Sequence, residues 1–409
     1  MRDGTFVTNT NKSGKASSIK LTFDVPMLLI VIVLLVYGVL MVYSASWDFS
    51  VLIMGKPPTH IFVRQVLWIL LGSGIAIVAS FFDYHRFYKV LVPMGLLTLG
   101  LLIATLIVNE KGSPDSTRML LGSSIQPSEL AKAVLVIYLS FWLYNRRESL
   151  NDIQASLIPM GIILGVTTML ILLQPDLSAA ITVIFLGVVL LFLAGCDWKL
   201  ILIIIILAII GGLPVMYLYP TGRERMSSYL TGLNNPLESS YHMQRSLEAV
   251  IKGGWFGVGL GQADTKFTGL PLPPTDSIFA VIAEETGIIG GLFLVILFLL
   301  LIWRGLVIAK RAPDQLGSLL AFGLTTWIGL EALMNMAVMV GLMPHIGNAL
   351  PLISAGGSNM VVTLTSLGII MNISKAKSNQ NPSERSSRSA VVDLRRRDGR
   401  GSVPRHNRF

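Results

Sequence analysis

Ten long apolar segments separated by polar turns constrain what this chain can fold into more than any other feature of its sequence. A helix needs about 20 predominantly apolar residues to cross the hydrocarbon core of a bilayer. Only 13% of the 409 residues are charged, against about a quarter in soluble globular domains. The sequence therefore predicts an all-α integral membrane protein, a polytopic bundle of about ten transmembrane helices. The predicted helices are residues 26–45, 63–82, 91–108, 130–143, 156–173, 179–195, 200–219, 278–309, 316–343 and 350–373.

The distribution of lysine and arginine predicts how this bundle is oriented. Ten crossings place both termini on one side, and the cytoplasmic segments of membrane proteins are enriched in Lys and Arg. The turns on the side of the termini carry the larger share of these residues even without the C-terminal tail. We therefore expect cytoplasmic termini, with a basic N-terminal tail at 1–25, a transmembrane domain at 26–374 and a disordered basic tail at 375–409.

Composition also limits the possible partners and cofactors. The net charge of +9 comes largely from the C-terminal tail, which predicts contact with acidic membrane lipid or a cytoplasmic protein and no nucleic-acid face. The single cysteine, Cys196, excludes an internal disulfide. The five histidines lack the spacing of metal ligands, so the sequence contains no metal-binding motif.

Asp276 is the strongest candidate for a chemical role. It lies in the stretch 253–287, where glycines, prolines and ionisable residues crowd together between long apolar segments. It precedes the apolar run that begins at Ile278, and the N-terminus of a helix favours an ionised carboxylate. Such a carboxylate can act as a general base. The alternative is a helix N-cap, a position that Asp commonly occupies.

Charged residues at the outer ends of other predicted helices suggest a cavity on the same side. Glu129 and Lys132 are three residues apart, so on a helix they share a face and can pair. Such a pair can either line a cavity or close a helix end at the interface. Asp176 is expected to cap the following helix or to help hold that cavity. Glu284 lies two turns beyond Asp276, on roughly the same helix face.

The outer loop 220–276 is the longest connection, and structureless loops of this length are usually functional. Residues 241–249, which include Gln244, are predicted to form a short amphipathic helix on the membrane. The alternative is a solvated, charged loop. In the last outer turn, Ser354 and Ser358 can hydrogen-bond a ligand.

Five motifs, in this order, resemble the SEDS family, the FtsW, RodA and SpoVE proteins of bacterial cell-wall synthesis. They are QPSELAK at 126–132, QPDL at 174–177, the element that begins with YHMQRS at 241–246, GGWFGVGLG at 253–261 with the TD at 275–276, and LPLISAGGS at 350–358.

The resemblance implies a peptidoglycan glycosyltransferase of the bacterial cytoplasmic membrane that polymerises lipid II, an undecaprenyl-pyrophosphate-linked disaccharide peptide. Polymerisation would take place on the outer face during cell division or cell-shape growth. It implies a catalytic Asp276, with phosphate-binding and other substrate-binding candidates at Arg118, Lys132, Lys266, Gln244, Ser354 and Ser358. Glu129, Asp176 and Glu284 are the expected structural supports. Pyrophosphate leaves without protonation, so one base and positive charge suffice; Mg²⁺ or Mn²⁺ suits pyrophosphate, although no motif demands a metal.

The resemblance also implies partners, namely a class B penicillin-binding protein transpeptidase and other division or elongation membrane proteins. Long basic tails favour the FtsW division type. The chain departs from the family at four positions. The family has tryptophan where this chain has Met119, glutamine where it has Glu331, and an aromatic residue where it has Ala355. Many division-type members have lysine where this chain has Ile346. We therefore expect Glu331 to be neutral or hydrogen-bonded and not catalytic.

Two other functions fit part of the pattern. A lipid II flippase would also need many helices and carboxylates at membrane depth, but the chain lacks a convincing internal repeat of the kind that transporters often contain. A non-enzymatic scaffold for the transpeptidase would not need Asp276 at all.

Overall fold

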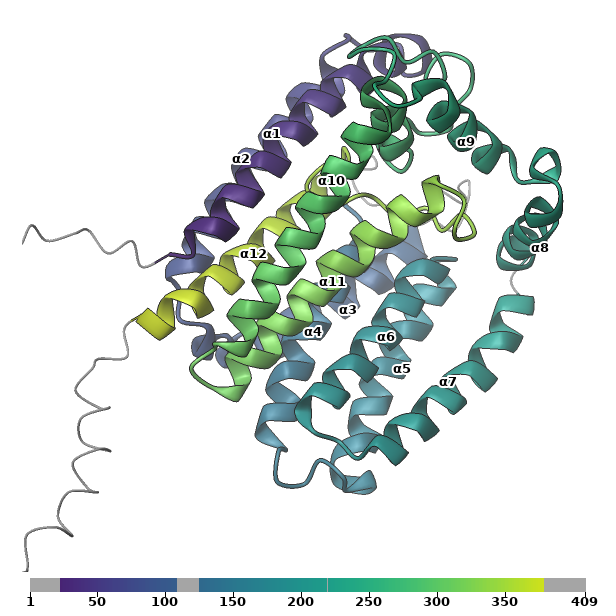
Figure 1. Ribbon diagram of the computed structural model, residues 1–409. Helices are drawn as coiled ribbons and strands as arrows, with labels where there is room; N and C mark the ends of the chain where they lie inside the picture. The colour runs from purple at the N-terminus through teal and green to yellow at the C-terminus, as the bar shows by residue number, and fades with distance from the viewer. Residues whose placement is uncertain (1–22, 109–124, 219, 379–409) are drawn as a thin grey trace, which may run out of the picture.

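The computed structural model describes residues 23–108, 125–218 and 220–378, and the regular secondary structure within these ranges is helical (Figure 1). Arg118, Met119 and most of both tails lie outside the described residues. The principal helices are α1 (Val25–Asp48), α2 (His60–Phe81), α3 (Leu91–Val108), α4 (Pro127–Asn145), α5 (Ile158–Leu173), α6 (Leu177–Ala194), α7 (Trp198–Leu218), α8 (Pro220–Asn234), α9 (Tyr241–Gly253), α10 (Ile278–Lys310), α11 (Gln315–Met339) and α12 (Gly357–Ser378).

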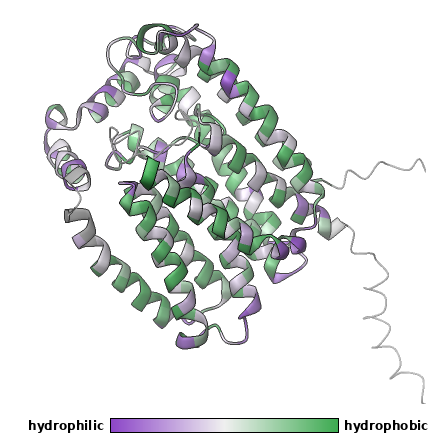
Figure 2. Cartoon of the chain, turned by 180° about the vertical axis from the view of Figure 1, so that it is seen from behind, coloured by the Kyte–Doolittle hydropathy of each residue, from purple (hydrophilic) through white to green (hydrophobic). Residues whose placement is uncertain are grey.

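Each of the ten predicted apolar segments overlaps a helix, which confirms the all-α membrane fold for the described residues. The last helix begins at Gly357 and not at Leu350, because residues 350–356 form the turn that precedes it. Eight of the helices are long and apolar enough to span a bilayer. The other two are α4, which carries charged side chains in its first turns, and α7, whose apolar part is Trp198–Gly212. Hydrophobic residues predominate along the helices of the bundle in Figure 2, as expected where lipid is the solvent.

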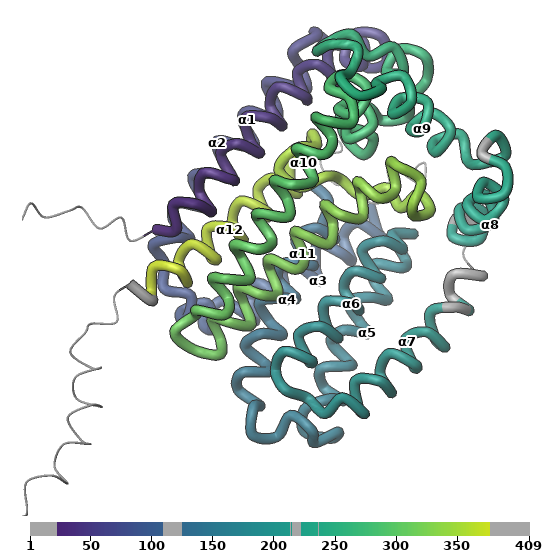
Figure 3. Tube along the Cα trace, in the orientation of Figure 1, coloured from purple at the N-terminus to yellow at the C-terminus, as the bar shows by residue number. Residues whose placement is uncertain are grey.

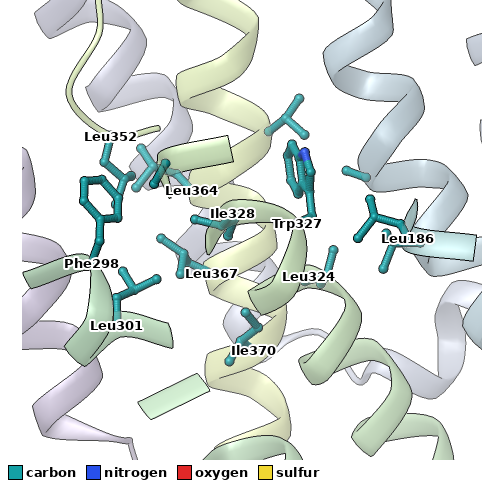
Figure 4. Close-up of a cluster of buried hydrophobic side chains, with 14 of the residues drawn as sticks. Leu186, Phe298, Leu301, Leu324, Trp327, Ile328, Leu352, Leu364, Leu367 and Ile370 are labelled. Atoms are coloured by element: carbon teal, nitrogen blue, oxygen red, sulfur yellow. The ribbon is translucent and has the colours of Figure 1, made fainter. Parts of the chain in front are cut away.

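The centre of the bundle is formed by α4, α10, α11 and α12, with α1 and α2 on one side and α3, α5 and α6 on the other. Trp327 of α11 is completely buried among aliphatic side chains from neighbouring helices (Figure 4). Helix α7 runs along the edge and packs mainly against α6 and α8 (Figure 3). Its exposed isoleucines, such as Ile206 and Ile210, are therefore expected to face lipid.

Close packing of α2 on α12 depends on small residues. A Cβ at Gly368 would lie 2.4 Å from the backbone oxygen of Ala76, and one at Gly72 would lie 3.1 Å from the Cα of Val361. Glycine at such crossings lets helix backbones approach closely. This contact holds the outer end of α2 beside the start of α12, where the site is formed.

Helix α10 is interrupted at Gly287, whose φ of 70° and ψ of −173° are not helical. The interruption leaves backbone groups available, and the loop after α9 bonds to them. Val258 donates to the Glu284 carbonyl at 3.0 Å, and Ile288 donates to the Gly254 carbonyl at 2.9 Å. The long outer connection is thereby folded onto the first turns of α10.

That outer connection contains more helix than the sequence analysis predicted. Helix α9 confirms the amphipathic helix expected at 241–249, whereas α8 was not predicted. Met226, Tyr229, Leu230 and Leu233 of α8 follow a helical spacing that the sequence analysis did not use, in a segment that is otherwise polar. Tertiary contacts hold it: Tyr229 donates to the Leu342 carbonyl at 2.9 Å and Arg225 to the Ile346 carbonyl at 3.3 Å.

Candidate functional site

A cavity of about 480 Å³ lies among the N-terminal ends of α2, α4, α6 and α12 and the loops that precede α10 and α12. This volume is typical of a small-molecule site. Five of the predicted site residues line it: Glu129, Lys132, Asp176, Asp276 and Ser358. Residues far apart in sequence thus meet at one site.

Asp276 lies just before α10 and is half-buried. Helix α10 begins at Ile278 with Ser277 at the N-cap position, so Asp276 lies one residue before the cap. The Asn335 amide donates to the backbone oxygen of Asp276 at 2.9 Å and to that of Asn348 at 2.6 Å. Gly347, whose φ of 66° favours glycine, lies beside this carboxylate: a Cβ there would be in ordinary contact, 3.5 Å from Asp276 Oδ2.

The turn before α12 holds the loop that carries Asp276. The Ser354 hydroxyl donates to the Thr275 carbonyl at 2.6 Å and accepts from the Leu350 N–H at 2.7 Å. The Ala355 N–H donates to the Pro274 carbonyl at 2.8 Å. Ser354 was predicted to bind substrate, but it is buried and does not line the cavity, so its observed role is to hold the Asp276 loop.

A buried ion network forms the floor of the cavity. The Lys132 ammonium lies 2.8 Å from Glu129 Oε1 and also pairs with Glu331. The Asn359 amide donates to the second oxygen of Glu129 at 2.9 Å. Glu331, which was expected to be neutral or hydrogen-bonded, is an ion-pair partner of Lys132. The network holds two carboxylates and one ammonium, so the cation offsets part of the buried negative charge.

Asp176 fulfils both of its predicted roles. One carboxylate oxygen accepts from the Ala179 N–H at 3.2 Å and so caps α6, while the other accepts from Gln126 at 3.1 Å and Ser128 at 3.0 Å at the start of α4. The Gln126 N–H donates to the Ser358 hydroxyl at 3.0 Å. Asp176 and Ser358 therefore join α4, α6 and α12 around the cavity.

Three predicted site residues lie outside the cavity, within the outer loop and the first turns of α10. The Lys266 ammonium pairs with Glu285 at 3.2 Å, and its side chain is only 3% exposed. The Gln244 amide donates to two carbonyls of the segment before α9, at 2.7 and 2.8 Å. Both were predicted to bind substrate, but they hold the outer loop. Glu284 is buried and accepts from the Asp264 N–H at 2.9 Å, which confirms a supporting position.

Arg64 lines the cavity but was not predicted from the sequence. It lies one turn into α2, beside Gln65, whose amide donates to the Ser354 carbonyl at 3.1 Å. The signal was present, because an arginine just inside an apolar span is unusual and often marks a functional position. Among the described lining residues, Arg64 and Lys132 are the basic ones.

Two histidines beside Asp276 also escaped prediction, because they are far apart in sequence. The rings of His242 and His345 stack with centroids 3.8 Å apart. His242 Nε2 lies 3.0 Å from the Ser277 hydroxyl. Burial, aided by the charge of Arg225, lowers the pKa of His242 to about 4. Its imidazole is therefore neutral at physiological pH.

The described lining of the cavity offers no ready set of ligands for a resident divalent cation. Asp176 already accepts hydrogen bonds on both oxygens, and Glu129 and Glu331 share the Lys132 ammonium. Within the described parts of the chain, no group of three or more His, Cys, Asp or Glu side chains is arranged to hold a metal.

Comparison with known proteins places this arrangement in one family. The FtsW/RodA/SpoVE family model, described as a cell cycle protein, matches residues 25–379. A Geobacter sp. (strain M18) protein named "Probable peptidoglycan glycosyltransferase FtsW" is 36% identical, covering 86% of this chain and 96% of its own length. The "Stage V sporulation protein E" of Bacillus subtilis (strain 168) is 33% identical, covering 86% and 97%.

Solved structures show the same fold. One chain, from work described as "Structural coordination of polymerization and crosslinking by a peptidoglycan synthase complex", has a TM-score of 0.69 and 25% identity, covering 88% of this chain and 100% of its own. The rod shape determining protein RodA of Thermus thermophilus has a TM-score of 0.61 and 23% identity, covering 88% and 99%.

Proposed function

This chain belongs to the FtsW/RodA/SpoVE family of cell cycle proteins, and we propose that it is a peptidoglycan glycosyltransferase that polymerises lipid II. The observation that carries the proposal is a single cavity that holds Asp276 together with the basic side chains Arg64 and Lys132. The enzyme names of the relatives, several of which are FtsW proteins, support the activity and the division type.

The chemistry needs one base and positive charge. A sugar hydroxyl of the acceptor attacks the anomeric carbon of the donor, and undecaprenyl pyrophosphate leaves. Asp276 accepts the hydroxyl proton as general base, a contribution of about a hundredfold to ten-thousandfold in rate. The leaving pyrophosphate needs cations close by but no proton.

Arg64 is the basic residue best suited to the phosphates. A guanidinium binds phosphate oxygens through two parallel hydrogen bonds. Lys132 also lines the cavity, but two carboxylates already offset its charge. Arg118 lies outside the described residues and stays a candidate. No step needs a metal from the protein; a Mg²⁺ or Mn²⁺ ion would arrive with the pyrophosphate.

One wall of the cavity suits the lipid portion of the donor. Phe49, Met54, Ile61 and Trp68 line it from the end of α1, the turn after it and the start of α2. Apolar side chains at this place can pack against the first isoprene units while the pyrophosphate faces Arg64. The substrate thus enters from the membrane and reacts at the membrane surface.

Location and partners follow from the same proposal. The cavity opens on the outer face of the bacterial cytoplasmic membrane, with both chain termini in the cytoplasm, as the Lys and Arg distribution predicts. A class B penicillin-binding protein is the proposed partner. The solved neighbour, from a complex that coordinates polymerization and crosslinking, supports this pairing.

Replacing Asp276 with asparagine tests the activity directly. Asn keeps the size of Asp, and the Asn335 amide contacts residue 276 through its backbone oxygen, so Asp276→Asn is expected to fold normally. Polymerisation should fall about a hundredfold or more, because the amide cannot accept the proton. Purified proteins are compared, with the partner transpeptidase, for glycan polymer length on a gel and for thermal stability.

Asp264→Asn is the matched control, because this carboxylate lies in the same outer loop, is 63% exposed and pairs with Lys252 outside the cavity. It should keep wild-type activity. A wild-type rate for Asp276→Asn would remove Asp276 as the base. A wild-type protein that makes no polymer but moves lipid II across vesicle membranes would favour the flippase alternative. A wild-type protein that shows neither polymerisation nor lipid II transport would favour the scaffold alternative.

A further inference from the structure

The loop that follows α9 exposes large apolar side chains that no described part of the chain covers. This loop, residues 254–260, has the sequence GWFGVGL and contains no charged residue. Trp255 is 68% exposed, Phe256 83% and Leu260 66%. Apolar side chains gathered at one exposed place usually mark a contact with another molecule or with a membrane, because their burial is favourable. A neighbour outside this chain is therefore expected.

The backbone of the 254–260 loop is joined to the first turns of α10. Val258 and Gly259 donate to the consecutive carbonyls of Glu284 and Glu285 at 3.0 and 3.1 Å, and two carbonyls of the loop accept from N–H groups just after the interruption of α10, at 2.9 and 3.3 Å. A Cβ at Gly257 would overlap the Glu285 carbonyl, so glycine there permits the close approach. Backbone groups that meet lipid must be paired within the protein, and α10 pairs these.

Two polar contacts between α1 and α10 mark the ends of the membrane span. At one end, Arg304 donates through two N–H groups to Asp24, each at 2.8 Å, and at the other end the Ser44 hydroxyl donates to Glu285 at 2.6 Å. The residues between these contacts, 25–43 and 286–303, carry no charge. Each stretch of helix from one contact to the other is about 30 Å long, which is the thickness of the hydrocarbon core. The contact between Ser44 and Glu285 therefore lies at the boundary of that core.

The 254–260 loop lies at the same boundary, because it bonds to the Glu285 carbonyl beside the outer end of α1 (Figure 1). Ile288 and Ile289, the next residues of α10 to which it bonds, are exposed and apolar, so the loop continues a surface that is expected to face lipid. On α1, Tyr43 and Trp47 are also exposed, and their rings make an edge-to-face contact. Tyr and Trp are enriched where a membrane meets water. The exposed aromatic residues of the loop fit that level.

We propose that the 254–260 loop inserts Trp255 and Phe256 among the lipids of the outer leaflet, at the boundary between headgroups and acyl chains. The bilayer is then the neighbour that covers them. The side chain of Glu284, whose carbonyl accepts from the loop, also accepts from the N–H groups of Asp264 and Thr265 at 2.9 and 3.2 Å. The anchor thus ties the segment that leads to the cavity to the membrane surface.

A protein is the other class of neighbour that could cover these side chains. Protein interfaces surround their apolar centre with a polar rim, and a soluble domain would dock above the lipid boundary. The 254–260 loop lies at the boundary and has no charged side chain of its own. The charged residues that flank it, Lys252 and Asp264, pair with each other at 3.0 Å. Lipid is therefore the occupant that the structure favours.

Nitroxide labels on single cysteines test the depth of the loop. The full chain, with its one buried cysteine removed by Cys196→Ser, is placed without partner proteins in nanodiscs of phosphatidylethanolamine and phosphatidylglycerol. Labels are attached at Phe256→Cys, at Leu292→Cys on the exposed side of α10, and at Asp264→Cys, a charged and exposed position. Collision with oxygen reports lipid, and collision with a water-soluble nickel complex reports water. The oxygen-to-nickel ratio at position 256 should resemble that at 292 and exceed that at 264.

Tryptophan fluorescence provides a second measurement that needs no label. Trp255→Phe keeps an apolar ring at this position, so the difference between its emission and that of the wild type isolates the signal of Trp255. Lipids brominated on the acyl chain near the headgroup should quench that difference signal.

Three results would overturn the proposal. The first is a label at position 256 that is as accessible to nickel as the label at 264. The second is a Trp255 signal that brominated lipids leave unquenched. The third is shielding of position 256 that appears only when the transpeptidase is added, which would assign the loop to a protein interface. These measurements use no lipid II, so they decide the proposal whatever the outcome for the proposed function.

Discussion

The ion network on the cavity floor allows a quantitative test of how charge is balanced inside the bundle. Lys132, Glu129 and Glu331 are all at most 5% exposed, and the ammonium contacts both carboxylates. With one cation and two anions, the network is already one negative charge in excess. Removing the cation and removing one anion should therefore have very different consequences.

Lys132→Met keeps the length and apolar stem of the side chain and leaves two buried carboxylates facing each other. Breaking a buried pair by removing one partner costs on the order of 3–5 kcal/mol, because an uncompensated charge stays buried. Glu331→Gln leaves the neutral Glu129–Lys132 pair, and the glutamine oxygen can still accept from Lys132. The expected cost is about 1 kcal/mol or less, that of weakening one hydrogen bond.

The double variant, Lys132→Met with Glu331→Gln, decides between charge balance and packing. It leaves one carboxylate, Glu129, which Asn359 still contacts. It should be more stable than Lys132→Met alone, although it carries one substitution more. Thermal unfolding of the purified proteins in the same detergent gives the order of their stabilities. The reasoning fails if Glu331→Gln is as unstable as Lys132→Met, or if the double variant is the least stable of the three.

Two further predictions concern the ends of the helices. His85 lies at the turn after α2, between Asp83 and Asp314 and 2.8 Å from each. Burial lowers the pKa of His85, but the two carboxylates outweigh burial and raise the pKa above its ordinary value. The stabilisation that protonated His85 contributes should therefore be complete below about pH 6.5 and lost as the pH rises through the pKa of the folded state. His85→Gln should accordingly lower the melting temperature more at pH 6 than at pH 8. An equal loss at the two pH values would contradict this. Topology reporters fused after Phe409 should read cytoplasmic, and reporters inserted within residues 233–240 should read external; an external C-terminus would place the cavity on the wrong face.

The long apolar helices of this protein could be predicted from the sequence because their signal is local. A run of apolar residues must become a helix in lipid, where each backbone polar group needs a partner within its own segment. The Glu129–Lys132 pair was also predictable, since three residues of separation place both side chains on one helix face. Asp276 stood out because glycines, prolines and ionisable residues surround it in the sequence. Whether it caps the helix or acts as a base depends on where α10 begins, which the sequence does not give.

Only the tertiary structure decided which side chains meet. Glu331 contacts Lys132 across 199 residues of sequence, and His242 stacks on His345, which follows it by 103 residues. Ser354 and Lys266 have the chemistry of substrate-binding residues, but the packing of loops directs them to the Thr275 carbonyl and to Glu285. Such partners depend on which helix faces approach each other. That approach is set by close contacts such as Gly368 against Ala76, which no local pattern encodes.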